Sequence, residues 1–271
     1  MARFLAALAC TVAVVGCSGG SDGEPPAWNH NPNDTTLGPR AWGEIDEAFE
    51  ECLAGKEQSP VDIAGAVPAD LPDLEFDYPD TPVTVANTGH TIEASIPESR
   101  DLTLTIDGVE YRLRQFHFHA PSEHTVDGKS YDTEVHLVHE SGEGEIAVIT
   151  VFLERSELEI TFVPSVLESA PEVAGEEVEL DLASPIRLLG VADATNAYGG
   201  DYATYAGSLT TPGCTEGVRW IVTSGAMPTS PAAIDRLHGL IADFPGYVGY
   251  ENNNRPTQPL NDRVIQRDAS G

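Results

Sequence analysis

The sequence contains very little lysine, few cysteines and no long apolar run after its first sixteen residues. Lysine occurs only at Lys56 and Lys129, and the 271 residues include 14 basic and 44 acidic ones. A chain with a net charge of −30 repels phosphate backbones and anionic lipid, so we expect no nucleic-acid partner. A membrane-spanning helix needs about 20 apolar residues, so the sequence also excludes a polytopic membrane protein.

The rest of the composition is that of a globular protein. Hydrophobic residues make up 41% and charged residues 21% of the chain, with 25 glycines and 20 prolines, which excludes a disordered, collagen-like or coiled-coil chain. The acidity has two explanations: adaptation to a saline environment, or simply a well-hydrated soluble surface. No second linker or internal repeat follows residue 28, so we expect one domain over residues 28–271.

The first residues indicate export. An apolar run from Phe4 to Val15 leads into Val14-Val15-Gly16-Cys17, which resembles a bacterial lipobox. We expect a lipoprotein signal peptide over residues 1–16, lipidation of Cys17 and a flexible tether over residues 17–27. The expected location is the periplasm or cell surface, with a lipid anchor in the outer membrane as the only membrane contact. An ordinary secretory signal is the alternative.

Two cysteines remain outside this leader, Cys52 and Cys214. In an oxidising compartment, two cysteines favour one disulfide bond between them. Two buried free thiols are the alternative that the sequence leaves open.

Short β-type runs dominate the body of the chain. Turn dipeptides at Asp107-Gly108 and Asp127-Gly128 separate some of these runs and favour hairpins. The helical candidates are few and short, so the class is mainly β with peripheral helices. The expected strands are 83–85, 91–96, 102–106, 111–119, 131–139, 146–153 and 218–223, and the expected helices are 45–53, 158–169 and 231–242.

Histidines on two successive strands form the most informative pattern. His117 and His119 are two residues apart and therefore share one face of a strand. Glu134 and His136 share a face of the next strand, which can fold back beside the first. Three neutral imidazoles on adjacent strands predict a zinc site with one open coordination position, which is the catalytic pattern. Three histidines hydrogen-bonded within a core are the alternative, which the cost of burying them disfavours.

Several segments in the same order resemble the α-class carbonic anhydrases. They are Trp42, Gln58–Ile63, the two histidine strands, Gly207–Pro212 and Asn254–Leu260. The bacterial branch is suggested by Pro121–His124 and by the two body cysteines. The resemblance implies a large, twisted, mostly antiparallel sheet of about ten strands with short peripheral helices.

The function implied by this resemblance is reversible hydration of carbon dioxide. Zinc hydroxide would attack CO2 to give bicarbonate, with Zn²⁺ as cofactor and CO2 or bicarbonate as the small-molecule partner. Thr210 and Glu123 would orient the hydroxide, and His90 would carry the proton away. A homodimer is left open.

The resemblance also assigns supporting residues. The side chains of Gln115 and Glu134 and the carbonyl of Asn253 would hold the metal-ligating histidines. The implied apolar substrate pocket and its bicarbonate contact consist of Val138, Val148, Leu209, Thr211, Val218 and Trp220. For each apolar residue taken alone, a place in the core explains its presence equally well.

The chain departs from the family pattern near the proton path. His30 follows the first tryptophan where many relatives carry a tyrosine, and Thr88 stands where some carry asparagine. The histidines without an implied role, His30, His124, His139 and His238, are expected to be structural or solvent-exposed.

Two other functions are compatible with the fold. One is a non-enzymatic surface adhesion or scaffold relative, which would be expected to lack one of the zinc histidines. The other is a zinc esterase, for which the sequence offers no Ser/His/Asp arrangement and no oxyanion glycine motif.

Overall fold

The structure is a computed structural model that describes residues 27–158, 162–182, 185, 187, 197–198, 201–247 and 249–268. The predicted signal peptide (1–16), the lipidation site Cys17 and the tether up to residue 26 lie outside the described residues. Within the described part of the chain, no helix has the length and apolar character needed to cross a membrane.

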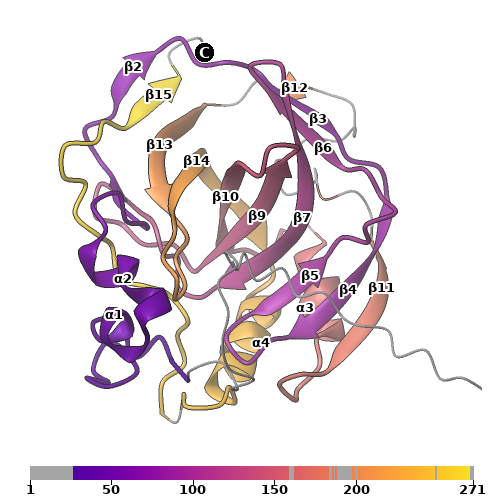
Figure 1. The fold of residues 1–271 in the computed structure, drawn as a ribbon. Helices are drawn as coiled ribbons and strands as arrows, with labels where there is room; N and C mark the ends of the chain where they lie inside the picture. Colours follow the sequence, from indigo (N-terminus) through magenta and orange to yellow (C-terminus); the bar gives the residue numbers. More distant parts are fainter. Residues whose placement is uncertain are drawn as a thin grey trace, which may run out of the picture.

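Strands make up most of the regular structure (Figure 1). They are β1 (Asp62–Ile63), β2 (Val67–Ala69), β3 (Leu74–Asp77), β4 (Thr81–Asn87), β5 (Ile92–Ser95), β6 (Thr103–Ile106), β7 (Val109–His119), β8 (Thr125–Val126), β9 (Thr133–Ser141), β10 (Ile146–Arg155), β11 (Glu177–Leu182), β12 (Ala197–Tyr198), β13 (Tyr202–Ser208), β14 (Glu216–Thr229) and β15 (Gln266–Asp268). The helices are α1 (Trp42–Ile45), the 3₁₀ helix η1 (Glu47–Phe49), α2 (Glu51–Ala54), α3 (Val163–Ser169) and α4 (Pro231–Ala242).

One large sheet organises the described residues. Its main path runs β11-β4-β5-β7-β9-β10-β14-β13-β15-β2, while β3, β6 and β12 extend it beside β7. Two neighbouring pairs on this path are parallel, β10 with β14 and β15 with β2, and the others are antiparallel. The predicted fold class, mainly β with a mostly antiparallel sheet of about ten strands, is confirmed.

The predicted strands overlap β4, β5, β6, β7, β9, β10 and β14, and those at 91–96, 102–106 and 131–139 begin one or two residues before the observed strands. The Asp107-Gly108 turn joins β6 to β7 as a hairpin, with φ values of 54° and 78° at its two residues, as a type I′ turn requires. Our sequence analysis missed strand β13, because its alanines, glycine and serine carry little β-propensity. It also missed β11, an acidic strand at the sheet edge.

The predicted helices have three different outcomes. Helix α4 has the predicted bounds; the Ser230 side chain accepts the Ala233 N–H at its start, and Pro231 occupies the first turn. The candidate at 158–169 is helical only from Val163 onward, and residues 159–161 lie outside the described part. The single helix predicted at 45–53 was wrong. Asp46 is extended and its side chain accepts the Ala48 N–H, so the chain forms α1, η1 and α2 instead.

The two faces of the sheet carry different clusters. The larger core packs one face against α3 and α4 and includes Phe116, Phe118 and Leu137. A smaller cluster around Val148 and Trp220 lies on the other side of these strands. Because side chains alternate along a strand, His117 and His119 of β7 and His136 of β9 point away from the larger core.

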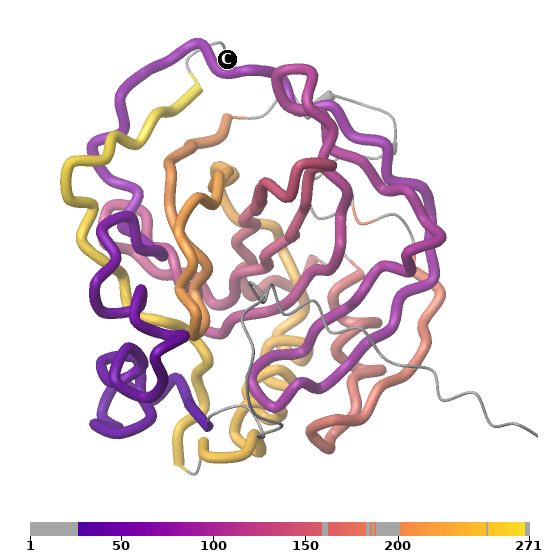
Figure 2. Tube along the Cα trace, in the orientation of Figure 1, coloured from indigo at the N-terminus to yellow at the C-terminus, as the bar shows by residue number. Residues whose placement is uncertain are grey.

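The C-terminal strand lies at the end of the sheet path, next to β2. Strand β15 pairs in parallel with β2, with Gln266 opposite Val67. Figure 2 shows this yellow C-terminal segment running beside the violet segment that contains β2.

The predicted disulfide is present in the structure. Cys52, in α2, is bonded to Cys214, which lies just after the segment that contains Thr210. Cys214 is fully buried, and its backbone N–H donates to the carbonyl of Thr211. The bond therefore ties the N-terminal helices to the turn between β13 and β14.

We predict that this disulfide contributes strongly to stability. It joins residues 162 positions apart, and the chain-entropy model for a loop of this length gives about 5 kcal/mol. The Cys52→Ser/Cys214→Ser double variant should therefore unfold at a lower urea concentration than the wild-type chain, by equilibrium denaturation. Added reductant should move the wild-type midpoint toward that of the variant. Equal midpoints for the two proteins would contradict the prediction.

Candidate active site

Three histidines converge on the face of the sheet opposite the larger core. His117 and His119 come from β7, and His136 from β9, where it lies directly opposite His117 in the strand register. One ligand-type nitrogen from each ring lies within 4.8 Å of the others, and the ring centroids are 4.6–5.1 Å apart. The strand pairing thus brings together the three residues that the sequence analysis predicted as ligands.

A hydrogen-bond acceptor occupies one nitrogen of each β7 ring. His117 Nδ1 lies 2.8 Å from Gln115 Oε1, and His119 Nδ1 lies 2.8 Å from the Asn253 carbonyl oxygen. These acceptors leave Nε2 of each ring free, and the buried His119 Nε2 has no partner among the described residues. Both rings are therefore held in the orientation and tautomer that a metal ligand needs.

Glu134 holds the third ring. Its Oε1 lies 2.5 Å from His136 Nε2 and 2.7 Å from His124 Nδ1, and its Oε2 accepts the backbone N–H groups of Glu123 and His124. Burial alone would raise the pKa of Glu134, but the two hydrogen-bonded histidines hold it well below its usual value. Glu134 is thus a buried carboxylate that leaves His136 Nδ1 free.

His124 has a role that the sequence analysis did not assign. It lies between Glu134 and the Tyr205 hydroxyl, which is 2.6 Å from its Nε2. Tyr205 in turn bonds to Ser59. The sequence analysis expected a structural histidine here, and its burial and hydrogen bonds agree with that expectation. Its partners Glu134 and Tyr205 are 10 and 81 residues away, so no local pattern identified them.

Burial keeps the three convergent rings uncharged. It lowers the pKa of His119 to about 4, that of His117 well below its ordinary value, and that of His136 in the same direction. Neutral imidazole is the form that ligates metal ions. The donor set, its burial and its free nitrogens therefore fit a divalent cation such as zinc.

Glu123 and Thr210 lie beside this cluster. Burial raises the pKa of Glu123 to about 7; His136, the Arg255 backbone N–H and the Thr210 hydroxyl oppose that rise. The Arg255 N–H donates to Glu123 Oε1 over 2.7 Å. Because a carboxylate only accepts hydrogen bonds, Thr210 is the donor toward Glu123. The sequence analysis missed Arg255, although the residue falls within one of the segments that carried the family resemblance.

The residues predicted for the apolar pocket gather in one cluster. Val148, Val218 and Trp220 are buried there, and the partly buried Val138 and Leu209 pack against them. Trp220 also contacts His136, with ring centroids 4.8 Å apart. An apolar wall therefore adjoins the histidine cluster.

A family model described as eukaryotic-type carbonic anhydrase matches residues 37–269. The chain belongs to this family. Carbonic anhydrases interconvert carbon dioxide and bicarbonate, so the family and the fold together support that activity here. The chain is an enzyme of the carbonic anhydrase class.

Individual carbonic anhydrases match most of the chain. The carbonic anhydrase of Klebsiella pneumoniae is 37% identical over 227 residues, which cover 84% of this chain and 86% of the relative. That of Neisseria gonorrhoeae is 36% identical over 263 residues, which cover 95% and 93%. The α-carbonic anhydrase of Thermovibrio ammonificans, solved with the inhibitor sulfanilamide, has a TM-score of 0.78 and 36% identity over 90% of this chain and all of its own.

His90 is covered by an aromatic ring in this carbonic anhydrase. Its imidazole stacks on Trp28, with centroids 3.8 Å apart and planes 7° apart. Burial lowers the pKa of His90 to about 4. The Asn253 side chain donates to the His90 carbonyl and to that of Phe118, which ties this turn to β7. The role of His90 as a proton carrier stays a prediction, and the stacked ring is a poor base near neutral pH.

The other histidines face different parts of the molecule. His139 lies on the opposite face of β9 and bonds to the Tyr78 hydroxyl in the larger core. His238, in α4, lies 2.9 Å from the Glu251 carbonyl oxygen. His30 is buried near His119, with ring centroids 6.3 Å apart.

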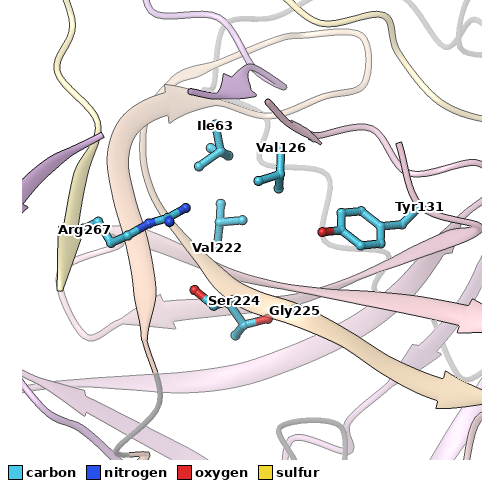
Figure 3. Close-up of a pocket in the computed structure, with 8 residues that line it drawn as sticks. Ile63, Val126, Tyr131, Val222, Ser224, Gly225 and Arg267 are labelled. Carbon is cyan, nitrogen blue, oxygen red and sulfur yellow. The ribbon is translucent and has the colours of Figure 1, made fainter. Parts of the chain in front are cut away.

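A separate cavity of about 120 Å³ lies further along β14 (Figure 3). Val222, Ser224 and Arg267 are among its lining residues, and none of the predicted site residues is. It offers no histidine or carboxylate, so it is distinct from the histidine cluster.

We predict that the Trp28→Ala substitution raises the pKa of His90 from about 4 toward the ordinary histidine value of about 6.5. The reason is that the smaller side chain exposes the imidazole to water, which favours its charged form. A pH titration of the histidine ring signals by NMR measures this shift, with His238 as the internal control. An unchanged His90 titration would show that Trp28 does not set its pKa.

Proposed function

We propose that His117, His119 and His136 hold a zinc ion, and that carbon dioxide is hydrated to bicarbonate there. The observation that carries this proposal is the convergence of three neutral imidazoles, each anchored through its other nitrogen. Zinc accepts such nitrogen donors in tetrahedral geometry, and three protein ligands leave one position for water. When bound, zinc supplies a water that ionises far more readily than bulk water.

Thr210 and Glu123 orient the reacting water. The Thr210 hydroxyl donates its proton toward the Glu123 carboxylate, so its oxygen is left to accept a hydrogen bond from that water. The water then donates to Thr210 and directs a lone pair at the carbon atom of the substrate. Holding the nucleophile in the reactive geometry is the contribution of these two residues.

The apolar cluster suits a substrate without charge. Carbon dioxide gains little from a charged clamp, and Val148, Val218 and Trp220 provide a wall without one. Thr211, which is partly exposed beside Thr210, is proposed to contact the bicarbonate product.

Proton release completes the cycle, and His90 is the proposed acceptor. It is the histidine that the sequence pattern favours for this step. In the stacked position its pKa of about 4 makes the transfer from a near-neutral donor unfavourable. We therefore propose that the ring takes up protons when it leaves the Trp28 stack.

The remaining proposals concern the cellular context. We propose that the leader exports the enzyme and that Cys17 anchors it by lipid at the periplasmic side or the cell surface. The excess of acidic residues supports adaptation to salt. Detection of acylated Cys17 by mass spectrometry tests the anchor, and enzyme stability across a salt series tests the adaptation.

Zinc content and stopped-flow CO2 hydration test the function together. We expect about one zinc per chain and fast hydration. Replacing Gln115 by alanine should weaken zinc affinity by roughly 10- to 100-fold, because His117 loses the acceptor that orients it. Arg112→Ala, an exposed change on the same strand, is the matched control.

The alternatives give different results in the same assays. A chain without zinc and without hydration favours the adhesion or scaffold function. Ester turnover without fast hydration favours a dedicated esterase. Unaltered zinc affinity in Gln115→Ala would contradict the proposed anchoring.

We also predict that Thr210→Val lowers kcat/KM for hydration on the order of 100-fold, because the water loses its orienting acceptor. Valine keeps the shape of threonine, so zinc content should not change. Thr105→Val, on β6, serves as the matched control. If Thr210→Val had the kcat/KM of the wild type, Thr210 would take no part in orienting the water.

A further inference from the structure

The cavity along β14 has no role in the proposed function, yet distant parts of the chain meet in its lining. Ile63 comes from β1, Val126 from β8, Val222 from β14 and Arg267 from β15, while Tyr131 lies just before β9. Its volume of about 120 Å³ is somewhat smaller than that of an engineered cavity of about 150 Å³ that binds benzene. The space therefore suits a molecule with about as many heavy atoms as one small ring.

An irregularity in β14 forms part of the lining. Residues 223–225 lie opposite a single residue of β10, because the register between the two strands shifts there. Gly225 has a φ of 76°, which side chains rarely adopt. Bulges of this kind occur often beside functional sites, since they redirect the side chains of a strand. Regular pairing is thus interrupted at the place where the cavity lies.

The inner wall of the cavity is apolar. Ile63 and Val222 are buried members of the smaller hydrophobic cluster, and the partly buried Val126 and Tyr131 pack against that cluster. The Tyr131 ring is held by stacking on Phe152, with ring centroids 4.3 Å apart. This wall suits the apolar body of a ligand, and it does not compensate a small inorganic ion for the loss of its water.

Two polar groups without protein partners face this wall. Figure 3 shows the Arg267 guanidinium and the Tyr131 hydroxyl directed into the cavity from opposite sides. Among the residues that the structure describes, the hydroxyl has no hydrogen bond and the guanidinium has neither a hydrogen bond nor an ion pair. By contrast, Arg112, Arg155 and Arg236 each pair with a carboxylate. No described lining residue of the cavity is acidic, so a positive charge stands there without its usual partner.

We propose that this cavity binds a small organic carboxylate, with the carboxylate group on Arg267 and Tyr131 and the apolar body against the inner wall. The planar guanidinium can donate two parallel hydrogen bonds to one carboxylate, and the tyrosine hydroxyl can donate a third. A single cation balances a single negative charge, which favours a monoanion over a dianion such as phosphate. The inference goes beyond the proposed function and does not depend on it, because the cavity is separate from the histidine cluster.

Methyl NMR of the full chain, titrated with benzoate, tests the proposal directly. The signals of Ile63, Val126 and Val222 should shift and saturate together, because these side chains line the cavity. Benzamide has the same ring without the negative charge, so it should bind about tenfold more weakly, as expected for loss of a charge-assisted hydrogen bond. Shifts confined to Val148 and Leu209 would show that benzoate binds beside the histidine cluster instead, and would overturn the proposal. Equal affinities for benzoate and benzamide would overturn it as well.

Two variants separate the contributions of the polar groups. Arg267→Gln should weaken benzoate binding about tenfold and leave benzamide binding nearly unchanged, because it removes the charge and keeps a polar side chain of similar length. Tyr131→Phe keeps the ring that stacks on Phe152 and should weaken benzoate binding several-fold. Arg100→Gln is the matched control, because Arg100 is an exposed arginine away from the cavity and its side chain also has no partner among the described residues.

The control decides whether the effect is local. Equal losses of benzoate affinity in Arg267→Gln and Arg100→Gln would indicate a general effect of net charge, and the proposal would be wrong. If Arg267→Gln lost the native methyl spectrum, the result for Tyr131→Phe would decide: an unchanged affinity for benzoate rejects the site. Failure of the proposed function is seen separately, as a lack of zinc or of CO2 hydration in the wild-type chain.

Discussion

Three imidazole rings share one buried point in this fold, and they can do so only if none of them is charged. The structure meets this condition by burial and by an acceptor for one nitrogen of each ring. The acceptors come from different parts of the chain: Gln115 from β7, Glu134 from β9 and the carbonyl of Asn253 from the C-terminal segment. The geometry of the site therefore depends on the closure of the C-terminal segment over the sheet, as well as on the pairing of β7 with β9.

Burying a carboxylate costs free energy, and the structure offsets this cost differently for Glu134 and for Glu123. Glu134 is held ionised by two histidines and two backbone N–H groups. Glu123 has fewer partners, and burial raises its pKa. The difference matches their positions: Glu134 holds a ring in place, whereas Glu123 faces Thr210. The disulfide from Cys52 to Cys214 restrains the turn that follows Thr210, so it also helps to hold the site in place.

The sequence predicted the parts of the site that follow from strand periodicity. That His117 and His119 share a face needed only the alternation of side chains along a strand. The sequence analysis expected the next strand to lie alongside, but it did not predict the register that sets His136 opposite His117. Contacts between distant segments left no such pattern. His124 bonds to Glu134 and Tyr205, and His30 bonds to Tyr247, across separations that no local spacing encodes. The helix expected at 45–53 failed for a local reason, because Asp46 caps a new turn instead of continuing the helix.

The segment where the described chain begins contacts His90, the proposed proton carrier. Trp28 and His30 both belong to the short segment where the described chain begins, and both lie against functional rings. The segment is held by the Trp42 indole, which donates to the Asn29 carbonyl over 3.0 Å. This attachment also keeps the Trp28 ring stacked on His90. A stacked His90 is a poor base near neutral pH, because burial lowers its pKa to about 4. We therefore expect the rate of the proposed proton transfer to depend on how firmly the Trp42 contact holds residues 28–30.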